Sequence, residues 1–142
     1  MRFSKDWTEF IRPEGEPIWR PTLSVFIKEV DGLNLYRFLV DSGADFSMAP
    51  YSLLQRLGKK WKEGERRLLK GISRKKACIV EGRVHEEDII IAEIGIQITI
   101  PVCFAKGDVP FLLGREGFFD YFLLSFDKIL RKTTFDFVEN SS

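Results

Sequence analysis

The chain has 142 residues, which suits a single domain with its own hydrophobic core but is short for a two-lobed enzyme. Its 22 basic and 21 acidic side chains nearly cancel, so charge gives no argument for a nucleic-acid partner or an anionic membrane. The N-terminus lacks the pattern of a signal peptide, and no apolar run approaches the roughly 18 residues that span a bilayer, so we expect a cytoplasmic protein.

The first strands are expected after an irregular N-terminal segment. Residues 1–19 mix aromatic, charged and proline residues without a period, and we expect them to form an arm that leads into a domain spanning residues 20–142. Apolar and other side chains alternate over residues 23–27, which predicts a strand. Asp31-Gly32 predicts a hairpin turn before a second strand over residues 35–40.

An acidic residue follows this second strand directly. Residues 38–40 are apolar, and Asp41-Ser42-Gly43 then forms a tight turn. We expect Asp41 to be buried, and burying a carboxylate costs several kcal/mol unless partners or a shared proton compensate for it. An aspartate at the end of a core strand is therefore a candidate for chemistry.

A short helix and a long extended region come next. Pro50 predicts the start of a helix that Gly58 ends, and the basic stretch 59–70 is expected to be a solvated loop and strand edge. Residues 94–104 carry isoleucine, valine or phenylalanine at every second position, which predicts a half-buried strand. Hairpin turns are expected at the glycines that interrupt the extended region, Gly82 and Gly95.

The residues between these glycines give no sign of a metal or thiol site. Glu86-Glu87-Asp88 is expected to be a solvated bend, and His85 a surface or edge residue. Because His85 is the only histidine, and Cys78 and Cys103 lack CxxC spacing, we predict no metal and no cofactor. Both cysteines are expected to pack as small core residues.

The C-terminal part repeats the pattern of a strand that runs into a glycine. An apolar strand ends at Gly114, and a short amphipathic helix is expected to follow with the phenylalanines of residues 118–122 on one face. Residues 123–126 and 133–137 are predicted to be terminal strands. Taken singly, each of these pieces is ordinary for a β protein.

In this order, the pieces resemble the retropepsin family of aspartic proteases over residues 20–137. Leu39-Val40-Asp41-Ser42-Gly43-Ala44-Asp45 is similar to the family's hydrophobic-hydrophobic-Asp-Thr/Ser-Gly-Ala signature, and Phe111-Leu112-Leu113-Gly114-Arg115 to its later hydrophobic-hydrophobic-Gly-Arg segment. Residues 71–85 look like the flap region of the protease domain in ubiquitin-receptor proteins of the DNA-damage-inducible type. Residues 113–119 resemble a stretch common in small prokaryotic members.

The resemblance implies an all-β, closed-barrel-like pepsin or retropepsin fold with a flap hairpin and one or two short helices. It further implies an aspartic endopeptidase without metal or cofactor, with a peptide or protein substrate. Peptide hydrolysis by this route needs two carboxylates around one water, and this chain has one such motif. A homodimer would therefore supply Asp41 from each subunit, and the pair would share one proton.

The same resemblance assigns roles to the neighbours of Asp41. Ser42 would hydrogen-bond across the dimer axis, and Gly43 would leave room for backbone amides and substrate. Asp45 and Arg115 would form an ion pair that Arg20 joins from the other subunit. The residues expected to bind substrate are Ala44, Gly71, Ile72, Ser73, Val109, Phe111, Leu112, Leu113 and Gly114.

Two segments depart from the family pattern and leave alternatives open. The flap is expected at residues 69–80, yet its tip, residues 71–76, has a single glycine and three consecutive cations. This tip either favours acidic peptides or marks a site that opens poorly, which makes a weakly cleaving peptide-binding or dimerisation domain the rival function. The dimer could use strand 133–138 or, alternatively, the N-terminal arm with its aromatic residues Trp7, Phe10 and Trp19.

Overall fold

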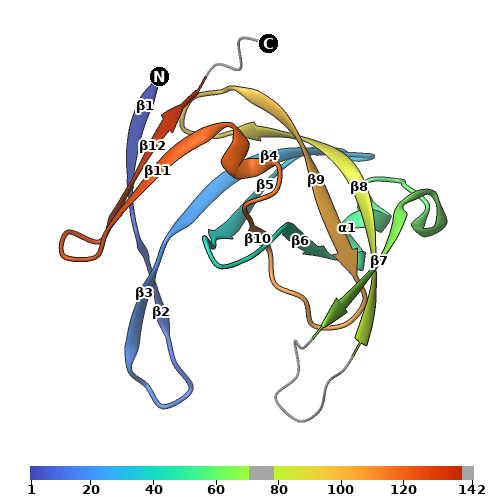
Figure 1. Ribbon diagram of the computed structural model, residues 1–142, viewed down its shortest axis with the longest axis horizontal. Helices are drawn as coiled ribbons and strands as arrows, with labels where there is room; N and C mark the ends of the chain where they lie inside the picture. Colours follow the sequence, from blue (N-terminus) through green and yellow to red (C-terminus); the bar gives the residue numbers. More distant parts are fainter. Residues whose placement is uncertain (71–78, 139–142) are drawn as a thin grey trace.

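In a computed structural model, which describes residues 1–70 and 79–138, strands make up most of the chain (Figure 1). Six strands pair in the order β4-β5-β10-β6-β9-β8, and β8 pairs again with β4, so the sheet closes on itself. The all-β, closed-barrel-like prediction is therefore confirmed. The barrel strands are β4 (Thr22–Glu29), β5 (Gly32–Val40), β6 (Ser47–Pro50), β8 (Ile79–Ile91), β9 (Gln97–Ala105) and β10 (Leu112–Leu113), and β7 (Glu65–Lys70) extends the sheet beyond β8.

The barrel interior is filled by side chains from the strands with alternating patterns. Leu23, Val25 and Ile27 of β4 are all at most 2% exposed, which confirms the strand predicted from their spacing. Ile98, Ile100, Val102 and Phe104 of β9 are buried in the same cluster. Burial of an aliphatic side chain contributes about 1.5–3 kcal/mol, so these strands supply much of the driving force for folding.

The N-terminal segment is made of strands, contrary to the irregular arm expected. β1 (Arg2–Asp6) pairs antiparallel with the last strand, β12 (Lys132–Phe137), which also pairs with β11 (Phe122–Asp127). β2 (Thr8–Ile11) and β3 (Pro17–Arg20) form a separate hairpin, at lower left in Figure 1. The local sequence did not reveal β1 because its partner lies at the other end of the chain. The domain boundary at residue 20 stays a prediction.

The helices are short. Helix α1 (Tyr51–Arg56) follows Pro50, and Gly58 adopts a φ of +70° after it, as predicted. A second turn, η1 (Trp61–Glu63), is a 3-10 helix, and the predicted amphipathic helix is the 3-10 turn η2 (Phe118–Asp120). None of the helices in the described residues has the length and apolar character needed to cross a membrane.

Strand β8 runs through two positions expected to be turns. Gly82 lies inside the strand, because a Cβ there would be 2.4 Å from Cys103 Sγ on β9. Glu87, expected in a solvated bend, is only 5% exposed, and its carboxylate lies 2.7 Å from Lys59 Nζ. His85 is also buried rather than on the surface. Of the two turns predicted at glycines, the turn at Gly95 is confirmed, with a φ of +68°, and the prediction of a turn at Gly82 was wrong.

The buried imidazole of His85 predicts a loss of stability on acidification. Burial lowers the pKa of His85 from its ordinary 6.5, and the nearby Lys59 charge lowers it further, while a backbone hydrogen bond with Trp61 acts the other way. The folded chain thus takes up this proton less readily than the unfolded chain. The contribution of His85 to the free energy of unfolding is complete above its ordinary pKa. It is lost as the pH falls through the lower pKa of the folded state.

Urea unfolding of the parent and His85→Gln between pH 7.5 and pH 5 measures this contribution. We expect the parent to lose more unfolding free energy than the variant over this range. Burial raises the pKa of Glu87, so Glu87 makes the folded state more stable as the pH falls, which is opposite to the effect of His85. Because both proteins contain Glu87, the difference between their pH profiles removes this effect. Parallel pH profiles for the two proteins contradict the prediction.

Candidate active site

Asp41 lies at the first position after β5, where two neighbouring segments hold the backbone. The Val40 N–H donates to the Pro21 carbonyl at 3.0 Å, and the Asp41 N–H donates to the Leu113 carbonyl at 3.0 Å. β10 pairs in parallel with the end of β5. The turn itself closes when the Gly43 N–H donates to Asp41 Oδ1 at 2.9 Å. The position and direction of Asp41 are therefore set by backbone bonds from three segments.

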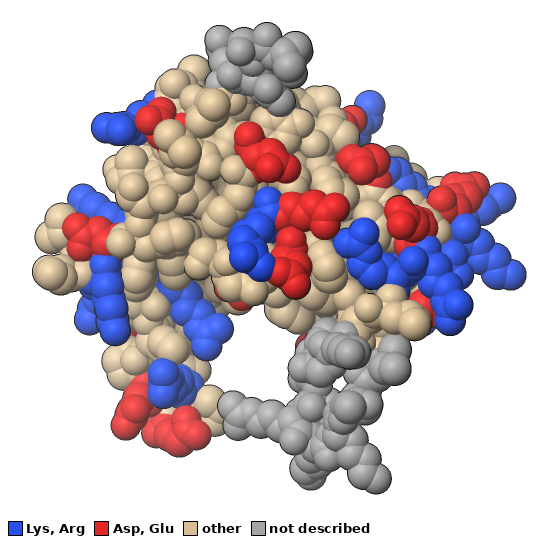
Figure 2. All heavy atoms as spheres, in the orientation of Figure 1, with Lys and Arg blue, Asp and Glu red and all other residues tan. Residues whose placement is uncertain are grey.

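Asp41 is exposed in the single chain, so the expectation that it would be buried was wrong. The apolar run ends at Val40, which is 5% exposed, and the turn carries the next three residues to the surface. A cavity of about 260 Å³ lies beside the carboxylate, lined also by Arg20, Pro21 and Leu39. In the space-filling view the molecule is hollowed between the β2–β3 hairpin, at lower left, and its main body (Figure 2).

The segment after Asp41 is bonded to the segment after β10. The Arg115 N–H donates to the Ala44 carbonyl at 2.9 Å, and the Glu116 N–H to the Asp45 carbonyl at 2.8 Å. Between them, the buried Ser47 hydroxyl accepts a hydrogen bond from the Gly114 N–H at 3.1 Å. A Cβ on Gly114 would lie 2.4 Å from the Phe46 carbonyl group, so only glycine fits there.

Ser47 is a supporting residue that the sequence analysis missed. It is completely buried between apolar neighbours in β6, and a buried hydroxyl needs a hydrogen-bond partner. A serine in a short apolar strand was the available signal. Its bond to Gly114 joins the start of β6, two residues after the first motif, to the second motif.

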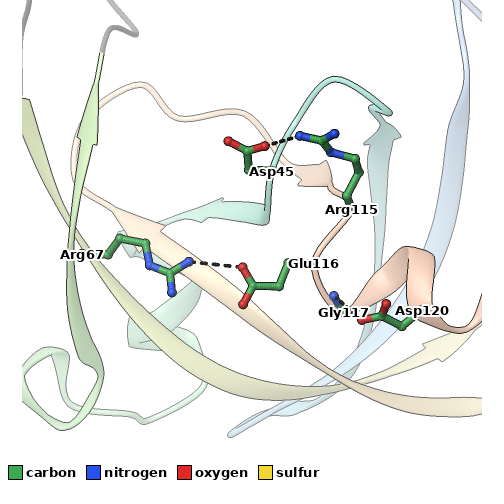
Figure 3. Close-up of polar contacts among 6 residues, drawn as sticks. All are labelled: Asp45, Arg67, Arg115, Glu116, Gly117 and Asp120. Carbon is green, nitrogen blue, oxygen red and sulfur yellow. Dashed lines mark hydrogen bonds and ion pairs between the residues drawn. The ribbon is translucent and has the colours of Figure 1, made fainter.

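Two ion pairs lie beside these backbone bonds (Figure 3). Arg115 pairs with Asp45, the two residues for which the resemblance implied an ion pair. Arg67 of β7 pairs with Glu116 at 3.4 Å, and its guanidinium lies 4.9 Å from the centre of the Phe46 ring. The Asp45 and Arg115 side chains are 72% and 57% exposed, so their pair contributes at most about 1 kcal/mol in the single chain.

The residues expected to bind substrate fall into separate environments. Val109 and Leu112 pack with Leu69 and Val80, one pair before the last described pair of β7 and β8, Lys70 and Ile79. Phe111 instead stacks on aromatic residues of β5. The Leu113 side chain is completely buried in the main core, which leaves its backbone for the predicted contact with substrate.

Of the remaining predicted residues, Ala44 is half-buried, Ser42 and Gly43 are exposed, and Gly114 is buried. β7 and β8 pair as far as Lys70 and Ile79. The expected flap tip, with Gly71, Ile72 and Ser73, lies outside the described residues, as does Cys78. Cys103 is 1% exposed, as predicted, and burial raises the pKa of its thiol. Within residues 1–70 and 79–138, no three His, Cys, Asp or Glu side chains gather as a metal site would require.

No protein-family model and no curated protein matches the sequence. Among solved structures, the crystal structure of a retropepsin-like aspartic protease from Rickettsia conorii aligns with 94% of this chain and 98% of its own. The TM-score is 0.62 at 16% sequence identity. The chain has a retropepsin-like fold. The resemblance to retropepsins is thus confirmed for the fold, and the finer likeness to DNA-damage-inducible proteins stays a prediction.

Within this retropepsin-like fold, the two sequence motifs lie side by side. The turn 41–43 follows β5, and residues 113–115 follow β10 next to it, with backbone bonds between the two segments. The roles of Ser42, Gly43, Arg20 and the substrate-binding residues stay predictions.

Proposed function

We propose that the protein is an aspartic endopeptidase that acts as a homodimer. The observation that carries the proposal is Asp41, whose carboxylate stands exposed on a turn that backbone bonds hold in place. Among the described residues the Asp41 carboxylate forms no ion pair and accepts a hydrogen bond from the Gly43 N–H of its own turn, so it is placed to meet a second copy of Asp41 across a two-fold axis.

The chemistry needs both carboxylates and one shared proton. Like charges this close do not both ionise, so one carboxylate is ionised and the other protonated. The ionised one accepts a proton from water, whose oxygen forms a bond to the scissile carbonyl carbon, while the protonated one donates to the carbonyl oxygen. The C–N bond of the resulting tetrahedral intermediate then breaks as the carboxyl that took the water's proton passes it to the leaving nitrogen, while the other carboxylate takes a proton from a hydroxyl of the intermediate, which becomes the carboxylic acid product. Activity is expected to be bell-shaped in pH.

Strand pairing within the chain favours one edge for the dimer. β12 lies between β1 and β11, so both of its edges are occupied, and the Trp7 indole donates to Thr133 Oγ1 at 2.9 Å in the same chain. Among the described residues, β1 and β11 are the outer strands of this sheet, and β11 carries two exposed apolar side chains, Leu123, 67% exposed, and Phe126, 40% exposed. An open strand with exposed apolar residues is suited to pairing with another chain. We therefore place the dimer contact on β11 rather than on strand 133–138.

Removing Arg20 tests the proposed contact between subunits. Arg20 is exposed, and in the dimer it would join the Asp45–Arg115 pair of the other subunit. Arg20→Ala is expected to raise the dimer dissociation constant roughly tenfold, a usual loss for an arginine at an interface. Sedimentation equilibrium measures this constant, with Arg56→Ala on helix α1 as the matched control. Equal constants for Arg20→Ala and the parent contradict the role of Arg20.

A digest of mixed peptides across pH tests the function itself. Hydrolysis that pepstatin inhibits, and that appears only at concentrations where the protein is dimeric, supports the endopeptidase. A protein that binds peptides without cleaving them at any pH supports the rival, a retropepsin-like binding domain. A protein that stays monomeric at high concentration contradicts the proposal, because the pair of carboxylates cannot form.

A further inference from the structure

The cavity beside Asp41 continues away from it toward the β2–β3 hairpin. Three adjacent cavities, of about 260, 150 and 270 Å³, all include Leu39 in their lining. The first also includes Asp41, and the third is bounded by the two strands of the hairpin. Together they form a groove that starts at the candidate catalytic carboxylate and ends at the hairpin.

The far part of this groove is lined mainly by apolar side chains. Phe10 and Ile18 are opposite each other in the β2–β3 pairing, and both line the cavity of about 270 Å³. Ile11 also lines it, although this side chain is 65% exposed. A drug-sized ligand needs a pocket of roughly 300–1,000 Å³, so this one fits one or two amino-acid side chains.

The charged residues along the groove are almost all basic. Arg12, Arg20 and Arg37 line it, and the single carboxylate in its lining is that of Asp41. Among the described residues, none of these arginines has a carboxylate within ion-pairing distance. Arg37 lies over the Phe10 ring, 5.4 Å from its centre. Arg20 is the residue that we assign to the contact between subunits, which leaves Arg12 and Arg37 for a ligand. Their guanidinium groups beside apolar surface suit a ligand that carries both carboxylates and apolar side chains.

We propose that the β2–β3 hairpin binds the outer part of a peptide substrate, several residues from the bond that is cleaved. The segment that it takes carries a large apolar side chain next to Asp or Glu. The proposal rests on the endopeptidase function and deepens it, because it names the class of substrate. In a symmetric dimer each subunit contributes one hairpin, so both ends of an extended peptide meet one.

Continuity with the catalytic end favours a peptide as the occupant. The groove opens at Asp41, where a scissile bond would lie, and its apolar part lies beyond Leu39. The cavity at Asp41 and the cavity at the hairpin share Arg20 and Leu39 in their lining, so an extended peptide held at Asp41 can pass from the first cavity into the second. Arg12 and Arg37 are exposed and available for the carboxylates on either side of an apolar anchor.

The test compares a short peptide that the protein cleaves with the same peptide extended at either end. One extension is Leu-Glu-Phe-Glu, and a second is Leu-Lys-Phe-Lys. We expect the acidic extension to raise kcat/KM about tenfold, mainly through KM, and the basic one to give no gain. Ile11→Ser and Arg12→Glu should remove the gain while leaving cleavage of the short peptide unchanged. Leu33→Ser and Lys28→Glu, at exposed positions of β5 and β4 outside the groove lining, are matched controls.

A binding measurement separates this proposal from the catalytic one. Fluorescence anisotropy follows the labelled acidic peptide on the parent and on Ile11→Ser. If no peptide is cleaved but Ile11→Ser weakens binding of the acidic peptide, the result supports the groove as a peptide-binding site and contradicts the proposed endopeptidase function. If short peptides are cleaved but the acidic extension gives no gain, the groove assignment fails alone. It also fails if Ile11→Ser and Arg12→Glu raise the dimer dissociation constant, because a second copy then occupies the groove.

Discussion

Replacing Asp41 by asparagine is expected to abolish peptide hydrolysis and to leave the fold intact. Asparagine cannot accept a proton from water, and in the dimer the change removes both carboxylates at once. We expect kcat/KM to fall by about 10³-fold or more. The side chain is exposed, and its hydrogen bond from the Gly43 N–H can be made equally by the asparagine Oδ1.

Peptide cleavage, thermal unfolding and sedimentation of this variant are to be measured together. Asp6→Asn is the matched control, since Asp6 is 81% exposed and lies in β1, away from the turn. We expect the control to keep full activity. An Asp41→Asn protein that cleaves peptides as fast as the parent would falsify the assignment of the catalytic residue.

Replacing Gly114 by alanine is expected to give the largest loss of stability among single changes at the site. The new Cβ would lie 2.4 Å from the Phe46 carbonyl carbon and oxygen, which are backbone atoms that cannot turn aside. To relieve the contact, the bonds that join residues 44–47 to residues 114–116 must lengthen. Such overpacking costs about 3 kcal/mol or more, which lowers Tm by roughly 10 °C in a domain of this size.

Gly43→Ala is the matched control for this change in stability. Its new Cβ would meet one atom, Asp41 Oδ1, at 3.3 Å, and that atom is the end of a side chain. We therefore expect Gly43→Ala to change Tm by much less than Gly114→Ala. Equal Tm values for Gly114→Ala and the parent contradict the tight contact between Gly114 and Phe46.

The parts of the fold that could be predicted from sequence are those in which one local pattern sets the structure. The alternation in β4 and β9 identified both strands, because period two places every second side chain inside the barrel. Pro50 and Gly58 placed helix α1 for an equally local reason, since each residue restricts or permits particular backbone angles.

The errors arose where a distant segment decides the structure. Glu87 belongs to a strand because Lys59 neutralises it and because β9 pairs alongside, and neither contact is visible in the sequence near Glu87. Gly82 looked like a turn, although its missing side chain makes room for Cys103. The exposure of Asp41 could not be read from the apolar run before it, because it depends on where the closed sheet ends.

The pairing of β1 with β12 makes the proposed dimer edge depend on contacts between residues that are far apart in the sequence. Arg2 pairs opposite Asp136, which is 134 residues away, and Asp6 pairs opposite Lys132. Contacts of large sequence separation slow folding, whereas a hairpin such as β4–β5 needs only local contacts. β11 belongs to the same sheet as β1 and β12, so we expect the edge on which we place the dimer to form after the local hairpins. A folding chain would therefore carry Asp41 before it can bring this residue beside a second copy.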